Sequence, residues 1–162
     1  MHHRLDEGRA LLGHGGGKGG AGGQHGYAYA NLSGAVTSGR FSLLAAGSYR
    51  RSDGYRHNTE FANYNAFVRA TYEAPRAGFF DLQAGYQNRT FGSNGFYAAY
   101  NPDQWEATST ALASLRWLKQ AGRFSFGASA SYRKNFDRYD WTRGTAMNRH
   151  NTDNVGARLW AD

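Results

Sequence analysis

The chain of 162 residues contains no cysteine and no isoleucine, and only three valines and two prolines. Without cysteine, disulfide scaffolds and thiolate metal sites are excluded. Leu, Val and Phe number 11, 3 and 10, about 15% of the chain, which is too little for a soluble core rich in branched aliphatics. No run approaches the roughly 18 consecutive apolar residues of a spanning helix. Helical membrane proteins are therefore excluded, whereas barrels are not.

Aromatic and small residues are abundant instead. The chain has 11 Tyr, 10 Phe and 4 Trp, together with 22 Gly, and so many aromatics with so few prolines are the reverse of a disordered composition. The net charge is +7, and arginines outnumber lysines 16 to 3. Large rings alternating with small residues predict β-strands.

Residues 1–23 differ from the rest of the chain. They include the glycine-rich run from Gly15 to Gly23, which has no periodicity of its own. A phosphate-binding loop is disfavoured because Lys18 is followed by Gly19 rather than Ser or Thr. We therefore expect residues 1–23 to be a disordered leader or the product of a mistaken start codon, and residues 24–162 to form the folded domain.

From Gln24 onward the polarity alternates with period two, as in strands with two different faces. One face carries no charge over residues 28–36, 41–49, 62–72, 80–86, 107–117, 124–132 and 155–159. Its rings fall at strand ends, as in Phe41 with Tyr49 and Phe124 with Tyr132. The other face is polar and includes six arginines: Arg50, Arg69, Arg89, Arg116, Arg133 and Arg158. A soluble sandwich also alternates, but its core needs bulk in the middle of each strand.

The connections alternate in length. Those at 38–40, 74–78 and 119–123 are tight, and those at 52–59, 92–104 and 136–151 are long. Rings eight residues apart on a strand tilted by ~40° are separated by roughly 20 Å along the membrane normal, close to the height of an outer-membrane apolar band. We predict an all-β, antiparallel meander of about seven transmembrane strands, curved but open, with edges at Tyr27 and Val155 and the six arginines facing a lumen.

Residues 23–162 resemble the barrel of TonB-dependent outer-membrane receptors, particularly the cobalamin-receptor-like group. The resemblance is carried by the segments 47–55 (GSYRRSDGY), 89–97 (RTFGSNGFY), 101–106 (NPDQWE) and 148–154 (NRHNTDN). It implies a barrel of about 22 strands with a plug, a ligand bound at the extracellular mouth, and uptake driven by the TonB complex. The chain departs from that pattern in having no plug, coupling box or export signal, so we expect a piece of a receptor.

Aromatic and amide side chains in the long loops suit a bulky organic ligand, since rings supply area and amides supply orientation. An alternative role is packing of the loops on the barrel wall. The candidate ligand-binding residues are Phe96, Tyr97, Tyr100, Asn101, Asp103, Gln104, Tyr55, Arg56, Tyr139 and Trp141. No residue spacing supports catalysis or a metal site, and we expect no enzyme activity and no cofactor.

The expected function is TonB-dependent uptake of a scarce ligand, such as cobalamin or an iron chelate, across the outer membrane of a Gram-negative bacterium. The expected partners are outer-membrane lipid, the remainder of the barrel with its plug, and the TonB complex, with no nucleic acid. One alternative is a complete small barrel or adhesin, disfavoured because seven strands are an odd number. Another is a soluble β-sandwich binding acidic glycans or nucleic acid through its arginines.

Overall fold

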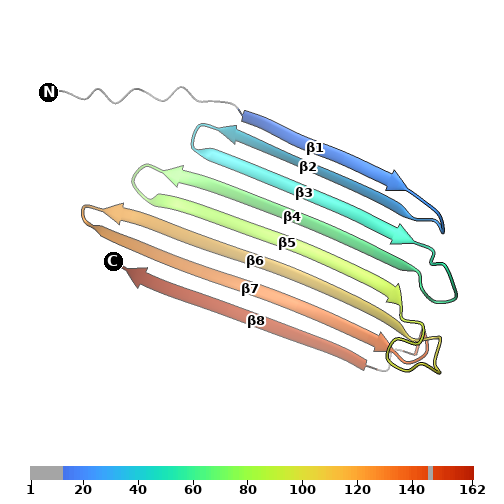
Figure 1. The fold of residues 1–162 in the computed structure, drawn as a ribbon. Helices are drawn as coiled ribbons and strands as arrows, with labels where there is room; N and C mark the ends of the chain where they lie inside the picture. Colours follow the sequence, from blue (N-terminus) through green and yellow to red (C-terminus); the bar gives the residue numbers. More distant parts are fainter. Residues whose placement is uncertain (1–12, 146–147) are drawn as a thin grey trace.

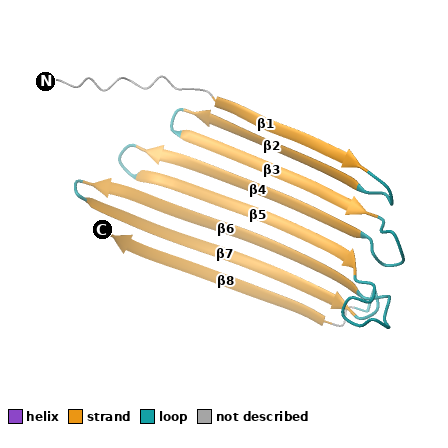
Figure 2. Ribbon diagram, in the orientation of Figure 1, coloured by secondary structure: helices purple, strands orange, loops and turns teal. Residues whose placement is uncertain are grey.

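The computed structural model describes residues 13–145 and 148–162, which form one antiparallel sheet of eight strands in sequence order (Figure 1). In the described part of the chain no helix is long and apolar enough to cross a membrane, and the ribbon consists of strands and loops (Figure 2). The strands are β1 (Gly13–Gly22), β2 (Ala28–Ser38), β3 (Phe41–Ser52), β4 (Phe61–Ala74), β5 (Gly78–Gly92), β6 (Trp105–Ala121), β7 (Phe124–Asp140) and β8 (Asn148–Ala161). The predicted meander of paired consecutive neighbours is confirmed.

The eighth strand corrects the prediction of seven. β1 lies in the glycine-rich segment that was expected to stay outside the fold, and it pairs with β2 from Gly13 opposite Thr37 to Gly22 opposite Ala28. Seven of its ten residues are glycine, so the sequence has almost no alternation of side chains that would indicate a strand. The backbone N–H and C=O groups are still present to pair with β2. The first edge of the sheet is therefore β1 and not the strand after Tyr27. Residues 1–12 lie outside the described residues.

The predicted alternation of loop length is confirmed. The tight connections, residues 39–40, 75–77 and 122–123, lie at one end of the sheet, which we call the turn end. Gly39 and Gly122 have φ of 57° and 63°, which two-residue hairpins require. The connections at the other end, the loop end, comprise residues 23–27, 53–60, 93–104 and 141–147. The last of these is shorter than predicted, because β7 and β8 stay paired as far as Tyr139 and Asn148.

The cross-strand register confirms the two predicted faces. On the apolar face Phe41, Tyr72, Phe80 and Trp117 lie opposite one another in successive strands. All six arginines lie on the polar face, whose rows run, for example, from Asn63 through Arg89 to Thr108. The polar face also holds an apolar patch that the sequence did not predict: Leu44, Phe67 and Leu112 are 40%, 37% and 42% exposed. Phe67 and Leu112 flank Gly85, which leaves room for them.

The described residues contain no buried apolar side chain, and the buried side chains are polar or charged. This follows from the architecture, because a single sheet has no second layer to cover it. The alternative of a sandwich is therefore wrong for the described residues. Each edge strand has one neighbour, and no ladder joins β1 to β8 in the sheet order, so the described sheet is open, as predicted.

Candidate ligand site at the loop end

Buried amides tie the first two long loops together. The Asn58 side chain is 8% exposed, and its Nδ2 donates to the carbonyl oxygens of Pro102, at 2.8 Å, and Gln104. Asn94 Nδ2 donates to the carbonyl oxygen of His57 at 2.6 Å. His57 Nε2 lies 2.6 Å from Asp103 Oδ1. These contacts fix loop 53–60 against loop 93–104.

The third loop is tied to the second by backbone and side-chain contacts. Asn101 Nδ2 donates to the carbonyl oxygen of Trp141 at 2.7 Å, and the Arg143 amide donates to the carbonyl oxygen of Asp103 at 2.9 Å. The buried Asp140 carboxylate accepts two bonds from Arg138, at 2.9 and 2.7 Å, and one from the Gly144 amide at 2.8 Å. The three loops therefore form one rim, with each loop holding the next.

A pocket of about 440 Å³ opens below this rim. It is formed by the end of β5, the start of β6 and the loops 53–60 and 93–104, and its lining comprises Arg56, Thr59, Arg89, Phe91, Gly92, Ser93, Asn94, Phe96, Tyr97 and Glu106. Arg89 and Phe91 belong to the polar face of β5, and Glu106 lies opposite Phe91 on β6. We call this cavity the mouth pocket.

One wall of the mouth pocket is a set of aromatic side chains. The Tyr97 ring meets Phe96 and Tyr139 edge to face, with centroids 4.9 and 5.1 Å apart. The Tyr97 hydroxyl donates to the Glu106 carboxylate, and this bond, with burial next, raises the pKa of Tyr97 to about 12. The phenol is therefore neutral and fixed by the acid, which orients the ring.

The predicted ligand-binding residues divide into three groups. Phe96, Tyr97 and Arg56 line the mouth pocket, and Tyr139 supports it through its ring contact with Tyr97. Another group, Asn101, Asp103, Gln104 and Trp141, holds the loops together; Gln104 is 0% exposed and accepts the Tyr97 amide at 3.1 Å. Tyr55 and Tyr100 are 68% and 83% exposed and lie outside the pocket lining.

The candidate set omitted seven lining residues: Thr59, Arg89, Phe91, Gly92, Ser93, Asn94 and Glu106. The alternation of β5 could have indicated Arg89 and Phe91, since both continue its polar face to the loop end. Gly92 has a different role, because a Cβ there would lie 2.4 Å from the carbonyl oxygen of Asn58. The loop approaches so closely that no side chain fits.

The arginines of the polar face have several kinds of partner. Arg69 makes two bonds to Asp81, at 2.9 and 2.7 Å, and Arg116 lies opposite Asp81 in the register. Arg116 and Arg158 stack on the Trp160 ring at 5.8 and 5.5 Å. Arg69, Arg116 and Arg158 are thus stabilised by acids and rings of their own strand or of nearby strands.

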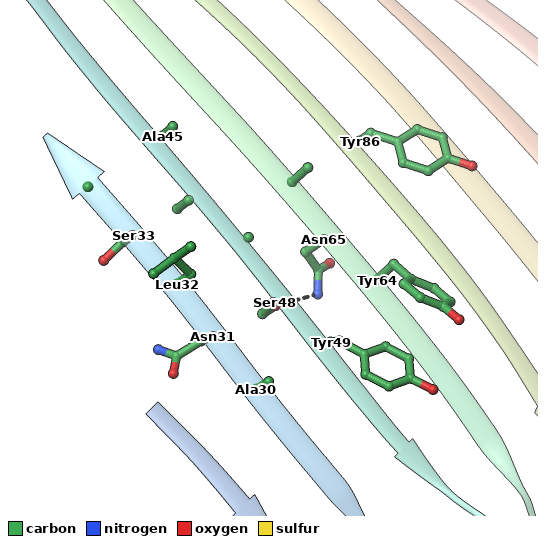
Figure 3. Close-up of a pocket in the computed structure, with 14 residues that line it drawn as sticks. Ala30, Asn31, Leu32, Ser33, Ala45, Ser48, Tyr49, Tyr64, Asn65 and Tyr86 are labelled. Atoms are coloured by element: carbon green, nitrogen blue, oxygen red, sulfur yellow. Dashed lines mark hydrogen bonds between the residues drawn. The ribbon is translucent and has the colours of Figure 1, made fainter. Parts of the chain in front are cut away.

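The apolar face has a separate hollow of about 820 Å³ over β2, β3 and β4 (Figure 3). Small residues such as Ala30, Ala45 and Ala66 form its floor, and the rings of Tyr49, Tyr64 and Tyr86 stand along one side. Asn65 donates to Ser48 across the same strands at 3.1 Å. The apolar lining gives this hollow little capacity to orient a polar ligand.

Comparison of the chain with models of protein families, with curated proteins and with solved structures found no match.

Proposed function

We propose that the chain forms part of the wall of a membrane-spanning β-barrel, with its apolar face toward lipid and its polar face toward a lumen. The observation that carries the proposal is an oblique line of rings on the apolar face. This tyrosine belt comprises Tyr49, Tyr64, Tyr86 and Tyr132. Tyr49 lies opposite Tyr64, but Tyr86 lies opposite Ala66, two residues nearer the turn end. Tyr86 also lies opposite Ala111 of β6. Tyr132 lies opposite Ala113, which is two residues nearer the turn end than Ala111.

The belt therefore shifts four residues over the four steps from β3 to β7, or one residue per strand. With ~3.3 Å per residue and ~4.8 Å between strands, the belt makes an angle of about 35° with the perpendicular to the strands. Strands of membrane barrels are tilted by ~35–45° from the bilayer normal. A line of rings at this angle follows the plane of a membrane interface.

A second belt lies near the turn end. It comprises Phe41, Tyr72, Phe80 and Trp117 in one cross-strand row, followed by Phe126, which lies two residues nearer the turn end. The shift of the rings toward the turn end is smaller in this belt than in the tyrosine belt, but it has the same direction. In β3 and β4 the rings of the two belts are eight residues apart, or roughly 20 Å in height at a tilt of ~40°.

From β2 to β8, the charged residues of the apolar face lie outside the band between the two belts. Arg51, Lys134 and Asp153 lie beyond the tyrosine belt, and Lys119 lies beyond Trp117. Between the belts, from β2 to β8, the same face holds Ala, Leu, Gly and Val. An apolar band bounded first by rings and then by charges is the pattern of a lipid-facing surface.

We further propose that the barrel is a receptor whose ligand binds in the mouth pocket. The resemblance to TonB-dependent receptors, the long tied loops at one end and a pocket on the luminal side of that end support a role in ligand uptake across the outer membrane of a Gram-negative bacterium. The open edges of β1 and β8 suit a segment of a barrel of about 22 strands, with a plug and the TonB complex as further partners. Cobalamin and iron chelates are the ligand classes proposed.

A complete small barrel is the second candidate, because the observed eight strands are an even number. It requires a ladder between β1 and β8, and the sheet order ends at these strands. The larger barrel is therefore favoured.

The test is refolding of the full chain into phosphatidylcholine vesicles, followed by flotation, protease digestion and equilibrium dialysis against cyanocobalamin and ferric citrate. We expect the chain to float with the vesicles, its strands to resist proteolysis, and one of the two probes to be retained. A chain that stays monomeric in buffer without lipid would overturn the barrel. An inserted chain that retains neither probe would overturn the receptor.

A further inference from the structure

We propose that the mouth pocket recognises an anionic group on its ligand, a carboxylate or a phosphate, through Arg56, Arg89 and the hydroxyl of Ser93. The inference rests on the proposed function in one respect only, the access of a ligand to the luminal side of the loop end. It specifies the chemical class of that ligand as an organic anion.

Four of the acids around the mouth already have partners. Glu60 pairs with Arg143, Asp103 contacts His57, and Asp53 pairs with Arg51 at 3.5 Å. Glu106, the one acid in the pocket lining, accepts the Tyr97 hydroxyl. Asp137 has a buried Oδ1 without a hydrogen-bond partner among the described residues, but Thr108 separates it from Arg89 in the cross-strand row and it does not line the pocket.

The two guanidinium groups of the pocket lining have no carboxylate partner among the described residues. Arg89 makes no ion pair there, and Arg56 contacts the Tyr55 ring at 5.4 Å. The backbone of Arg56 is held by Thr59, whose hydroxyl donates to the Arg56 carbonyl at 2.9 Å and accepts its amide at 3.3 Å. Both arginines line one cavity of about 440 Å³, so a single ligand can reach both.

Ser93 provides an independent indication of a ligand. The residue lines the pocket and is 4% exposed, and its buried Oγ has no hydrogen-bond partner among the described residues. A buried hydroxyl without a partner carries a desolvation cost, which a bound oxygen would remove. A carboxylate or phosphate offers that oxygen and also matches the planar donors of arginine.

The remaining lining defines the body of the ligand. The rings of Phe91 and Phe96 offer apolar area, whereas the Tyr97 hydroxyl is engaged by Glu106 and the Asn94 amide by His57. The pocket therefore suits an anion attached to an aromatic or apolar group, held by charge at one end and by ring contacts at the other.

The test uses the full chain refolded in dodecylmaltoside, with phenylphosphonate as the anionic probe and benzamide as the neutral one. Binding is followed by NMR, through the phosphorus signal for the first and saturation transfer for the second. We expect phenylphosphonate to bind at least tenfold more tightly than benzamide. Arg89→Gln and Arg56→Gln should each weaken it by about tenfold, and Ser93→Ala by about threefold. Arg76→Gln, which removes the same charge at the turn end, should leave binding unchanged.

Equal binding of the two probes, or equal losses in Arg76→Gln and Arg89→Gln, would overturn the anion site. Vesicle insertion is measured separately by protease protection. Absence of anion binding by an inserted chain thus contradicts this inference and not the barrel. Selective anion binding by a chain that does not insert contradicts the barrel and not this inference.

Discussion

At the scale of single residues, polar side chains supply the burial that apolar ones supply in a globular protein. Asn58, Asn101, Gln104 and Asp140 are at most 8% exposed. Asn58 and Asn101 donate to carbonyl oxygens of a neighbouring loop, and Gln104 accepts the Tyr97 amide within its own loop. These partners offset the cost of burial, except at Gln104 Nε2, which has no hydrogen-bond partner among the described residues. The rim therefore depends on individual hydrogen bonds rather than on packed apolar area.

The Tyr97 phenol should give the rim a pH limit in alkali. Its pKa is raised from 10.0 to about 12, so the bond to Glu106 contributes fully below about pH 10 and is lost as the pH rises through about 12. We expect Tyr97→Phe to make loop 93–104 more sensitive to proteolysis at neutral pH and to remove the alkaline dependence of that sensitivity. Digestion measures the sensitivity, and absorbance at 295 nm follows the ionisation of the phenol. Tyr100→Phe is the control, since Tyr100 is 83% exposed. Identical alkaline curves for wild type and Tyr97→Phe would contradict the assignment.

At the scale of elements, alternation predicts a strand only where there are side chains to alternate. β2 to β8 and their two faces could be predicted because rings and arginines occupy opposite parities. β1 could not, since glycine fits any pattern. The mouth pocket was predicted in part: Phe96, Tyr97 and Arg56 were named from composition, whereas Ser93 depends on how two distant loops meet. The tie between Asn58 and Gln104 spans 46 positions, and no local signal records it.

Among the described residues, strand β1 contains the one charge that lies between the belts. Lys18 lies opposite Leu32 on the apolar face, where a cation at the bilayer midplane costs roughly 2 to 4 kcal/mol. We expect Lys18→Leu to raise the fraction of chain folded in vesicles, measured by the shift in gel mobility between unheated and heated samples. Lys119→Leu is the matched control, because Lys119 lies beyond Trp117 and can reach water. Equal effects of the two substitutions would place β1 outside the membrane sheet.

Strand β7 allows a direct comparison of the two faces. Ala128 lies between Trp117 and Leu159 on the apolar face, whereas Arg116 lies beside Ser129 on the polar face. We expect Ala128→Arg to block folding in detergent, since it introduces a cation into the apolar band between the belts, which costs roughly 2 to 4 kcal/mol if this band faces lipid, as proposed. Arg116→Ala should fold with little change. If Ala128→Arg folds like wild type and Arg116→Ala does not, the faces have been assigned backwards.

At the scale of the whole molecule, the described sheet has two exposed faces and two open edges. In water such edges promote aggregation, and rings on an uncovered face add to it. A bilayer would cover the apolar face, and neighbouring strands would cover the edges. The described sheet has no core of its own, so it is consistent with a segment of a barrel wall that lipid and neighbouring strands would cover.

The most direct test of the central claim compares two tryptophans near the turn end that lie on opposite faces. Trp117 belongs to the apolar face, opposite Phe80, and Trp160 to the polar face, opposite Gly127. Variants retaining only one of them, with the other three tryptophans replaced by Phe, are inserted into vesicles containing lipids with brominated acyl chains. We expect strong quenching of Trp117 fluorescence and little quenching of Trp160 fluorescence. Equal quenching of both, or stronger quenching of Trp160, would contradict this claim.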